Sequence, residues 1–280
     1  MNSRETLETF RSTHHLCQTT IAGHTWCWYA GGIGSQTVVM LPGAGAFGAL
    51  GAEVMFPVIT ALEQHYRIIA FGYHFEATTV RALINGIHAL LEEQHVQQAS
   101  FVGHSLGSLL TLCYLDTYPQ QVSSVVIANF ALPSPTHMRS LQRALSLVVR
   151  LPAWVTARVV KAQFRQSLQD YADDFWLQYL TGKEAESSFR HMKTHYRCLL
   201  DFVQHWQISP ESFASWPGKA LILESDLERD VTTQERANTQ ALFMNSSVHV
   251  FYHARHLSFV THTQEFTETV IHFLSGVRGT

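Results

Sequence analysis

Residues 100–107 read Ser-Phe-Val-Gly-His-Ser-Leu-Gly, and they decide the fold because two segments of different pattern meet there. A short apolar run leads into the stretch, and a longer apolar run with helical pattern, residues 109–115, follows it. A strand, a Gly-x-Ser-x-Gly turn and a helix in this order are the context of a nucleophile elbow. We therefore predict that Ser105 is a catalytic nucleophile.

The two glycines of this motif have a steric role. In such an elbow the serine takes a strained backbone conformation, and the helix doubles back closely on the strand. Side chains two residues before and two residues after the serine would collide there. Gly103 and Gly107 are therefore expected to permit the close approach of helix and strand.

Composition indicates a globular chain with a sizeable core. The 280 residues are 46% hydrophobic and 15% charged, which predicts one large domain with room for an inserted subdomain. A formal charge of -3 gives no support to nucleic-acid binding. No apolar stretch has the length of a transmembrane segment, and the first 20 residues lack the apolar centre of a signal peptide, so we expect a cytoplasmic protein.

The cysteines and histidines do not form a recognisable metal motif. Cys17, Cys27, Cys113 and Cys198 lie far apart and show no CxxC spacing. The 17 histidines include no HExxH sequence. We therefore expect neither a zinc site, nor a disulfide framework, nor a metal-dependent reaction.

Strand and helix patterns alternate along most of the chain. Two β-favouring runs, residues 15–21 and 24–29, predict an opening hairpin. Further strands are expected at residues 38–41, 66–71, the run before Ser105, 122–130, 220–223 and 248–252, and helices at residues 52–65, 80–91, 233–243 and 263–274. This alternation predicts an α/β fold with a mostly parallel sheet covered by helices on both faces.

The alternation stops between Leu132 and Lys219. This interval has helical patterns rich in aromatic residues, which predicts a helical lid at residues 133–218. Residues 1–132 and 219–280 would then form the core. Most of the aromatic side chains are expected to pack the lid onto the core, and a few to line an apolar pocket above Ser105.

A serine hydroxyl needs a histidine base, and the histidine needs a carboxylate that fixes its tautomer. Four acids follow the strand at residues 220–223, namely Glu224, Asp226, Glu228 and Asp230. Three histidines occur in or after the last strand, namely His249, His253 and His256, and His249 lies within the strand pattern. Acid and histidine thus follow the serine in the chain order that this elbow predicts.

The chain resembles the α/β-hydrolase superfamily in its Pro42-Gly43-Ala44 turn, in its Gly-x-Ser-x-Gly elbow and in its Arg255-His256-Leu257-Ser258-Phe259 loop. The resemblance implies that the backbone N–H groups of Ala44 and Leu106 form the oxyanion hole. It also implies that His256 is the base, with His253 as a spare. The family register places Glu228 at the acid position, with Asp226 and Asp230 as alternatives.

Three departures from the family pattern stand out. Pro42 replaces the usual histidine and Arg255 the usual glycine, and neither change removes a catalytic atom. The stretch at residues 70–76 replaces a longer glycine-rich loop, and in this the chain is similar to the maspardin-like branch. That similarity keeps a non-catalytic interaction protein as an alternative to an enzyme.

The lid is basic. Residues 133–169 contain no Asp or Glu, but they include Arg139, Arg143 and Arg158. An ordinary solvated helix face explains this, and so does a cationic rim that attracts an anionic substrate or carrier. The chain is similar in this arrangement of charge to the carrier-protein methyl esterases of biotin synthesis, which implies acyl esters on acyl carrier protein or coenzyme A.

We expect a cofactor-independent serine esterase that forms an acyl-enzyme, with a carrier-linked ester such as pimeloyl-carrier-protein methyl ester among its candidate substrates. The alternatives are an acyl thioesterase and a lipase. In the lipase alternative, Leu141, Leu145, Val148 and Val149 lay the lid on an anionic membrane.

Overall fold

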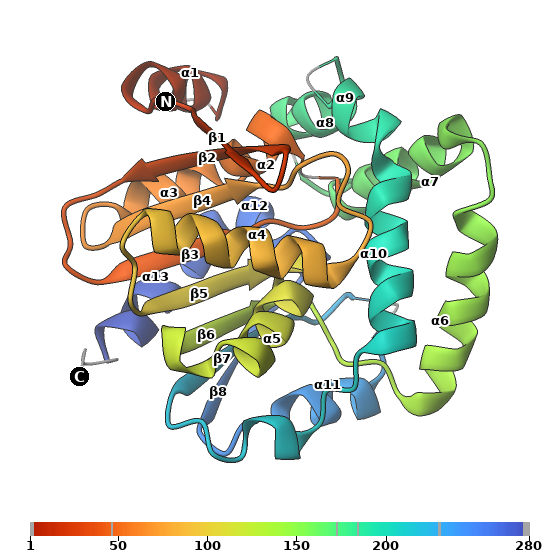
Figure 1. The fold of residues 1–280 in the computed structure, drawn as a ribbon. Coiled ribbons are helices and arrows are strands. Elements are labelled where there is room, and N and C mark those ends of the chain that lie inside the picture. Colours follow the sequence, from red (N-terminus) through yellow and green to blue (C-terminus); the bar gives the residue numbers. More distant parts are fainter. Residues whose placement is uncertain (1–2, 46, 172, 184, 229–230, 277–280) are drawn as a thin grey trace.

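The apolar runs assemble into one sheet, whose arrangement is seen in Figure 1. The computed structural model describes residues 3–45, 47–171, 173–183, 185–228 and 231–276. Within these residues the sheet has eight strands in the order β1-β2-β4-β3-β5-β6-β7-β8. The strands are β1 (Cys17–Ile21), β2 (His24–Gly31), β3 (Thr37–Leu41), β4 (Arg67–Gly72), β5 (Ala99–His104), β6 (Val122–Ala128), β7 (Lys219–Ser225) and β8 (Ser246–Phe251).

The predicted fold class is confirmed. The opening hairpin β1-β2 is antiparallel, and β2 also pairs antiparallel with β4. All later pairs are parallel. Every residue of β3 and β5 is buried, as continuous apolar runs require at the centre of a sheet that is covered on both faces.

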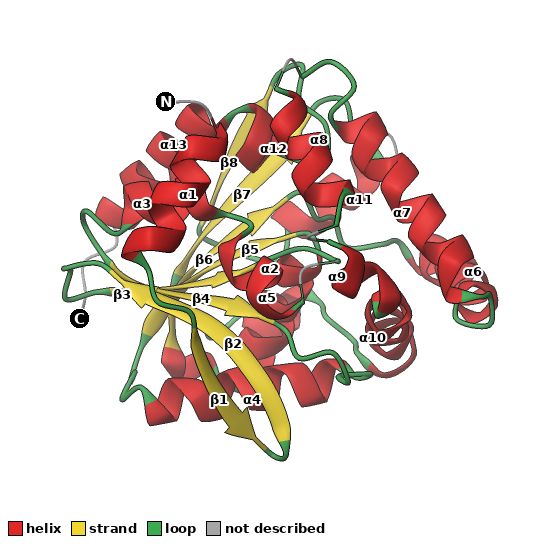
Figure 2. Cartoon of the chain, turned by 90° about the horizontal axis from the view of Figure 1, so that it is seen from above, coloured by secondary structure: helices red, strands yellow, loops and turns green. Residues whose placement is uncertain are grey.

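Two layers of helices cover the sheet, one on each face (Figure 2). One layer contains the packed helices α1 (Ser3–Thr13), α3 (Phe56–Leu62) and α13 (Thr263–Ser275), near α12 (Ser258–Thr261). The other contains α4 (Val80–Glu93) and α5 (Leu106–Thr117), which pack against each other. The shorter elements are α2 (Gly48–Glu53), α11 (Thr233–Gln240), η1 (Pro119–Gln121) and η2 (Pro210–Phe213).

A helical insert joins β6 to β7. It consists of α6 (Pro135–Val148), α7 (Ala153–Ser167), α8 (Asp174–Thr181), α9 (Glu186–Arg190) and α10 (Met192–His205). Figures 1 and 2 show α6, α7 and α10 beyond the carboxyl ends of the parallel strands. Ligands of open α/β sheets bind outside these strand ends, so the insert stands where it can cover a site.

Two local predictions need correction. A single helix was expected at residues 52–65, but α2 and α3 are separate, and Met55 between them has a non-helical backbone. Pro57 lies in the first turn of α3, where its missing N–H costs no hydrogen bond, so it helps the second helix begin. Helix α1 was not anticipated, although Leu7 and Phe10 form a buried stripe at helical spacing.

Half of the twelve aromatic side chains in residues 133–218 are buried, and five more are partly buried against the core, as expected. Phe175, Trp176 and Tyr179 belong to the core cluster that also contains α3. Trp154 is an exception, because 65% of it is exposed at the start of α7. Among the described residues, no helix is both long and apolar enough to cross a membrane.

Candidate active site

Ser105 stands on a strained turn between β5 and α5. Its φ of 53° and ψ of −113° lie outside the regions that L residues favour. A Cβ on Gly107 would lie 1.9 Å from the carbonyl oxygen of Leu41, and one on Gly103 would lie 2.5 Å from the carbonyl oxygen of Gly107. Both glycines are therefore sterically required for the approach of α5 to the sheet.

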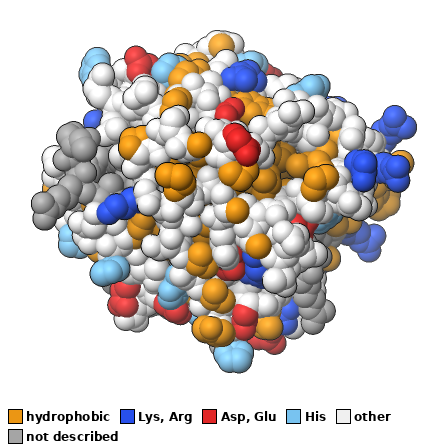
Figure 3. Space-filling model, turned by 90° about the horizontal axis from the view of Figure 1, so that it is seen from below, with side chains coloured by type: hydrophobic (Ala, Val, Ile, Leu, Met, Phe, Trp, Pro, Cys, Tyr) orange, Lys and Arg blue, Asp and Glu red, His pale blue; other side chains and the backbone are white. Residues whose placement is uncertain are grey.

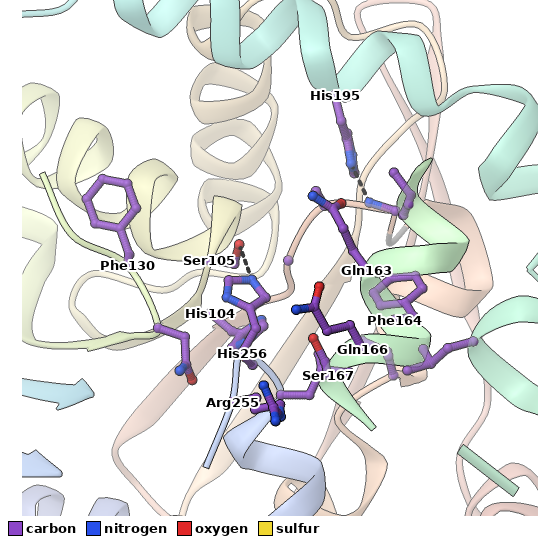
Figure 4. A pocket seen from close by; sticks show the side chains of 18 of the residues that line it. His104, Ser105, Phe130, Gln163, Phe164, Gln166, Ser167, His195, Arg255 and His256 are labelled. Carbon is purple, nitrogen blue, oxygen red and sulfur yellow. Dashed lines mark hydrogen bonds between the residues drawn. The ribbon is translucent and has the colours of Figure 1, made fainter. Parts of the chain in front are cut away.

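Three side chains from three loops meet at this turn. His256 Nε2 lies 3.0 Å from Ser105 Oγ, and His256 Nδ1 lies 2.5 Å from Glu228 Oε1 (Figure 4). The carboxylate can only accept, so Nδ1 carries the proton and donates to Glu228. The lone pair of Nε2 is then directed to the serine hydroxyl, which is the arrangement of a general base beside a nucleophile.

Glu228 is held by a second partner. The side-chain amide of Asn129 donates to Glu228 Oε2 at 3.0 Å and to Ser225 Oγ at 2.8 Å. Burial opposes the charged form of Glu228, but the charge and hydrogen bond of His256 and the bond from Asn129 outweigh it, so the pKa of Glu228 lies below its ordinary value. The carboxylate thus stays ionised next to His256.

The alternative acids and bases lie elsewhere. The Asp226 carboxylate is exposed and accepts from the backbone N–H of Ala254 at 3.1 Å, which stabilises the turn after β8. Asp230 lies outside the described residues. His253 is exposed, and His249 Nε2 lies 2.9 Å from Glu265 Oε1.

His104, just before the nucleophile, is hydrogen-bonded to the backbone of the proposed base. Its Nε2–H donates to the backbone carbonyl of His256 at 2.7 Å. Burial, and then the nearby His256, lower the pKa of His104 to about 3. A neutral His104 therefore positions the loop that carries His256 without adding a charge beside it.

The turn that contains Ala44 is fixed on both sides. Tyr73 donates from its hydroxyl to the carbonyl oxygen of Pro42 at 2.7 Å. The N–H of Gly45 donates to His195 Nδ1 of α10 at 2.5 Å. Because the Gly45 N–H is already bonded to His195, the Ala44 N–H is the better candidate in this turn for an oxyanion donor.

Leu106 is the first residue of α5. Its N–H belongs to the first turn, where helix N–H groups have no partner within the helix and the helix dipole favours negative charge. The two backbone N–H groups expected from the sequence thus belong to the turn after β3 and to the first turn of α5, and Ala44 lines the same cavity as Ser105.

A cavity of about 450 Å³ opens above Ser105. Helices α7, α9 and α10 supply much of its wall, and its apolar lining includes Leu141, Val160, Phe164, Phe189, Met192 and Tyr196. Polar side chains also face it, namely Asn129, Gln163, Gln166, Ser167, His195 and Arg255. Figure 4 shows Gln163, Gln166 and Ser167 along one side of this space. Its size and lining suit a small organic molecule.

The basic residues of the insert lie outside this cavity. Arg139 and Arg143 are exposed and line a separate hollow on α6 together with Arg150, and Arg158 is exposed on α7. Figure 3 shows Lys and Arg side chains gathered at the edge of the molecule. Of the four apolar residues expected to face a membrane in the lipase alternative, Leu145 is buried and Leu141 lines the cavity, whereas Val148 and Val149 are partly exposed.

Sequence reasoning missed three residues of the site. Asn129 follows an apolar strand and has a φ of 49°, a conformation that Asn tolerates, but a lone Asn after a strand is a weak signal. His195 lies 150 residues from Gly45 in the chain, so no local pattern could link them. Arg255 was noted only as a departure from glycine. Among the described residues no group of three or more metal-ligating side chains occurs.

Comparison with known proteins agrees with this architecture. A family model described as the alpha/beta hydrolase fold matches residues 36–263. The match spans most of the chain, from the strand before Ala44 to the loop after His256. The chain belongs to the α/β hydrolase fold family.

Individual relatives are distant. A curated protein of Yersinia enterocolitica, "Putative carbamate hydrolase RutD", is 29% identical over 104 residues, which are 34% of this chain and 36% of that protein. The match thus spans about a third of the curated relative.

Solved structures share the fold at low identity. A hydrolase of Pseudomonas aeruginosa is 17% identical with a TM-score of 0.73, covering 93% of this chain and 98% of that chain. A thermophilic esterase of Thermogutta terrifontis is 14% identical with a TM-score of 0.74, covering 95% and 100%. An enol-lactonase of Burkholderia xenovorans is 15% identical with a TM-score of 0.72, covering 92% and 100%.

Proposed function

We propose that this chain is a serine hydrolase that cleaves a carboxylic ester through an acyl-enzyme on Ser105. The observation that carries the proposal is the continuous hydrogen-bonded chain from Ser105 Oγ through His256 to Glu228, at the floor of a cavity of about 450 Å³. A serine without a catalytic role would not require a histidine whose other nitrogen is held by a largely buried carboxylate.

In the proposed reaction, His256 Nε2 takes the proton of Ser105 as Oγ attacks the ester carbonyl. The resulting oxyanion accepts hydrogen bonds from the N–H groups of Ala44 and Leu106, each contributing about 3 kcal/mol of transition-state stabilisation. Collapse of this intermediate breaks the ester bond, and His256 gives its proton to the departing alkoxide. An alcohol leaves and an acyl group stays on Ser105.

Water completes the proposed cycle. His256 takes a proton from a water molecule as its oxygen attacks the acyl-enzyme. As the second tetrahedral intermediate collapses, the bond to Ser105 Oγ breaks, His256 returns the proton to Oγ, and the carboxylic acid leaves. Glu228 stabilises the imidazolium in both halves and keeps Nδ1 protonated. The chain's own residues supply every proton transfer, so the proposed mechanism uses no cofactor.

The helical insert is proposed to act as a lid, with residues 133–218 covering a core of residues 1–132 and 219–280. Val160 and Phe164 of α7 and Met192 of α10 face the cavity from this lid. An apolar wall of this kind suits the acyl chain of the substrate. Thioesters and lipids would also meet an apolar wall, which keeps thioesterase and lipase activities as alternatives.

A finer proposal concerns presentation of the acyl group. Arg139, Arg143 and Arg158 are exposed on α6 and α7, in an insert segment that lacks acidic residues from 133 to 169. Such a surface attracts an acidic acyl carrier protein or coenzyme A, so a carrier-linked ester such as pimeloyl-carrier-protein methyl ester remains among the proposed substrates.

The test of the main proposal is hydrolysis of nitrophenyl esters of graded chain length by the wild type and by Ser105→Ala. We expect the variant to lose at least about 10⁴-fold in kcat with an unchanged melting temperature, because the nucleophile is removed and no packing is lost. A carbamate and a thioester in the panel identify the preferred bond. Activity that persists in a folded Ser105→Ala would refute the proposal.

The carrier proposal has its own test. Reversal of Arg139 and Arg143 to Glu is expected to raise KM for an ester on acyl carrier protein by about tenfold, because surface charge steers association. Small soluble esters should show no change in KM, since neither arginine lines the main cavity. An equal effect on both substrate types would reject recruitment of a carrier.

A further inference from the structure

Arg255 immediately precedes the proposed base and lines the cavity. Only 15% of its side chain is exposed. Among the described residues its ion-pair partner is Asp170, with 3.2 Å between Arg255 Nη2 and Asp170 Oδ2. Arg255 Nε is buried and has no hydrogen-bond partner there. The guanidinium group is thus largely removed from water but incompletely bonded.

The Asp170 partner compensates this burial poorly. The Asp170 side chain is 73% exposed, and ion pairs with solvated carboxylates contribute little to stability. A buried N–H group without an acceptor is unfavourable, more so when it belongs to a charged group. Among the described lining residues, Glu228 is the one other Asp, Glu, Lys or Arg, and it is bound to His256. Among the described residues, the charge of Arg255 at the cavity wall is therefore paired with the solvated Asp170 alone.

The surroundings of Arg255 are polar within a mainly apolar pocket. Figure 4 shows Gln166 and Ser167, at the end of α7, on the same side of the cavity as Arg255. Both also line the cavity. The planar guanidinium offers parallel N–H donors that match a carboxylate, and neighbouring amide and hydroxyl groups can complete such a site.

We infer that Arg255 binds a carboxylate carried by the substrate, so that the preferred ester has an anionic group in its acyl or its alcohol part. The inference rests on the proposed esterase function and deepens it. A carboxylate in the cavity pairs with a guanidinium whose ion-pair partner among the described residues is the solvated Asp170, and it fixes one end of the substrate beside His256.

A purely structural role would leave a different signature. If Arg255 only ties the end of α7 to the core through Asp170, removal of either partner has the same result. If Arg255 binds substrate, the Asp170→Asn variant still has the guanidinium and retains the preference for substrates that carry a carboxylate. Asp170→Asn is therefore the matched control for Arg255→Gln, and Arg255→Lys retains the charge but loses the planar fork.

The experiment compares kcat/KM for two families of substrate against neutral counterparts of equal length. Monophenyl esters of succinic, glutaric and adipic acid carry the carboxylate on the acyl part, and phenyl butyrate, pentanoate and hexanoate are their neutral counterparts. Acetate esters of hydroxy acids, against those of simple alcohols, carry it on the alcohol part. Isothermal titration calorimetry of Ser105→Ala with monomethyl glutarate measures binding without turnover.

We expect the wild type to prefer one of the two carboxylate series over its neutral counterparts. Arg255→Gln should lower this preference by at least about tenfold, mainly by raising KM for the carboxylate substrates. Asp170→Asn should retain the preference. Arg255→Lys should be intermediate. Monomethyl glutarate should bind Ser105→Ala more weakly when Arg255→Gln is added.

Ser105-dependent hydrolysis of neutral esters without a carboxylate preference would overturn the inference while leaving the proposed function intact. So would a preference that Arg255→Gln does not alter, or one that Asp170→Asn reduces equally. Failure of the proposed function itself is distinguishable, because no ester would then be cleaved in a Ser105-dependent way.

Discussion

The strand ends that carry Ser105 and the helical insert above them differ in how firmly each is fixed. Every residue of β3 and β5 is buried, and the site loops are cross-linked by Asn129 and His104. In the insert, Leu147 and Trp154 are 64% and 65% exposed, and α7 begins without a side-chain cap. The comparison suggests that the sheet fixes the reacting atoms and that the insert sets which molecule reaches them.

Two contacts connect these regions at the site. His195 of α10 accepts from Gly45 in the proposed oxyanion turn, and Arg255 beside the base pairs with Asp170 in the loop after α7. The first contact lies entirely in the interior, whereas the second has an exposed partner. Variants on either side of these contacts can therefore separate effects on chemistry from effects on substrate choice.

The largest expected effect on kcat is at the strand ends that hold the proposed catalytic residues. Glu228→Gln should lower kcat by about 10³- to 10⁴-fold, because an amide in place of the carboxylate no longer secures the tautomer that leaves Nε2 free to accept. Asp226→Asn is the control, since Asp226 contacts the backbone N–H of Ala254 instead of the base. If Asp226→Asn were the more damaging variant in ester hydrolysis, the assignment of the acid would be wrong.

A stability effect with a definite sign follows from two buried histidines. Burial lowers the pKa of both His104 and His195 to about 3. Below pH 6.5 these side chains take up protons in the unfolded chain but stay neutral in the fold, so the free energy of unfolding falls as pH falls. The loss should be about 1.5 kcal/mol for each histidine between pH 6.5 and pH 5.

Urea unfolding at pH 6.5 and pH 5 measures this loss. His195→Asn keeps an acceptor where Nδ1 stands and removes one titrating group, so its stability should depend less on pH by the contribution of one histidine. Equal pH dependence of the wild type and His195→Asn would contradict a buried neutral His195.

A smaller effect is expected where the insert contacts the oxyanion turn. His195→Phe keeps the stacking on Phe47 but removes the acceptor for the Gly45 N–H, and kcat should fall by about tenfold as this turn loosens. His195→Asn should recover part of the loss, and KM for small esters should change less than kcat. A rise in KM with an unchanged kcat would instead show that His195 acts only as part of the pocket wall.

Local patterns predicted the sheet well, because alternating strands and helices around a Gly-x-Ser-x-Gly turn restrict the topology to a few arrangements. The same patterns offered four acids and three histidines in or after the last two strands, and the resemblance to the α/β-hydrolase superfamily singled out Glu228 and His256. The structure brings both to Ser105. His195 and Asn129 act through contacts made only in three dimensions. The break between α2 and α3 was missed because the apolar pattern runs through both helices, although Pro57 is compatible with a helix start there.

The most direct test of the central claim is labelling of the wild-type protein by a fluorophosphonate probe, with Ser105→Ala and Asp226→Asn in parallel. The account predicts covalent labelling of the wild type and of Asp226→Asn, located at Ser105 by mass spectrometry, and none of Ser105→Ala. Absence of labelling in a folded wild-type protein would contradict an activated serine and would favour the alternative of an interaction protein on a hydrolase fold.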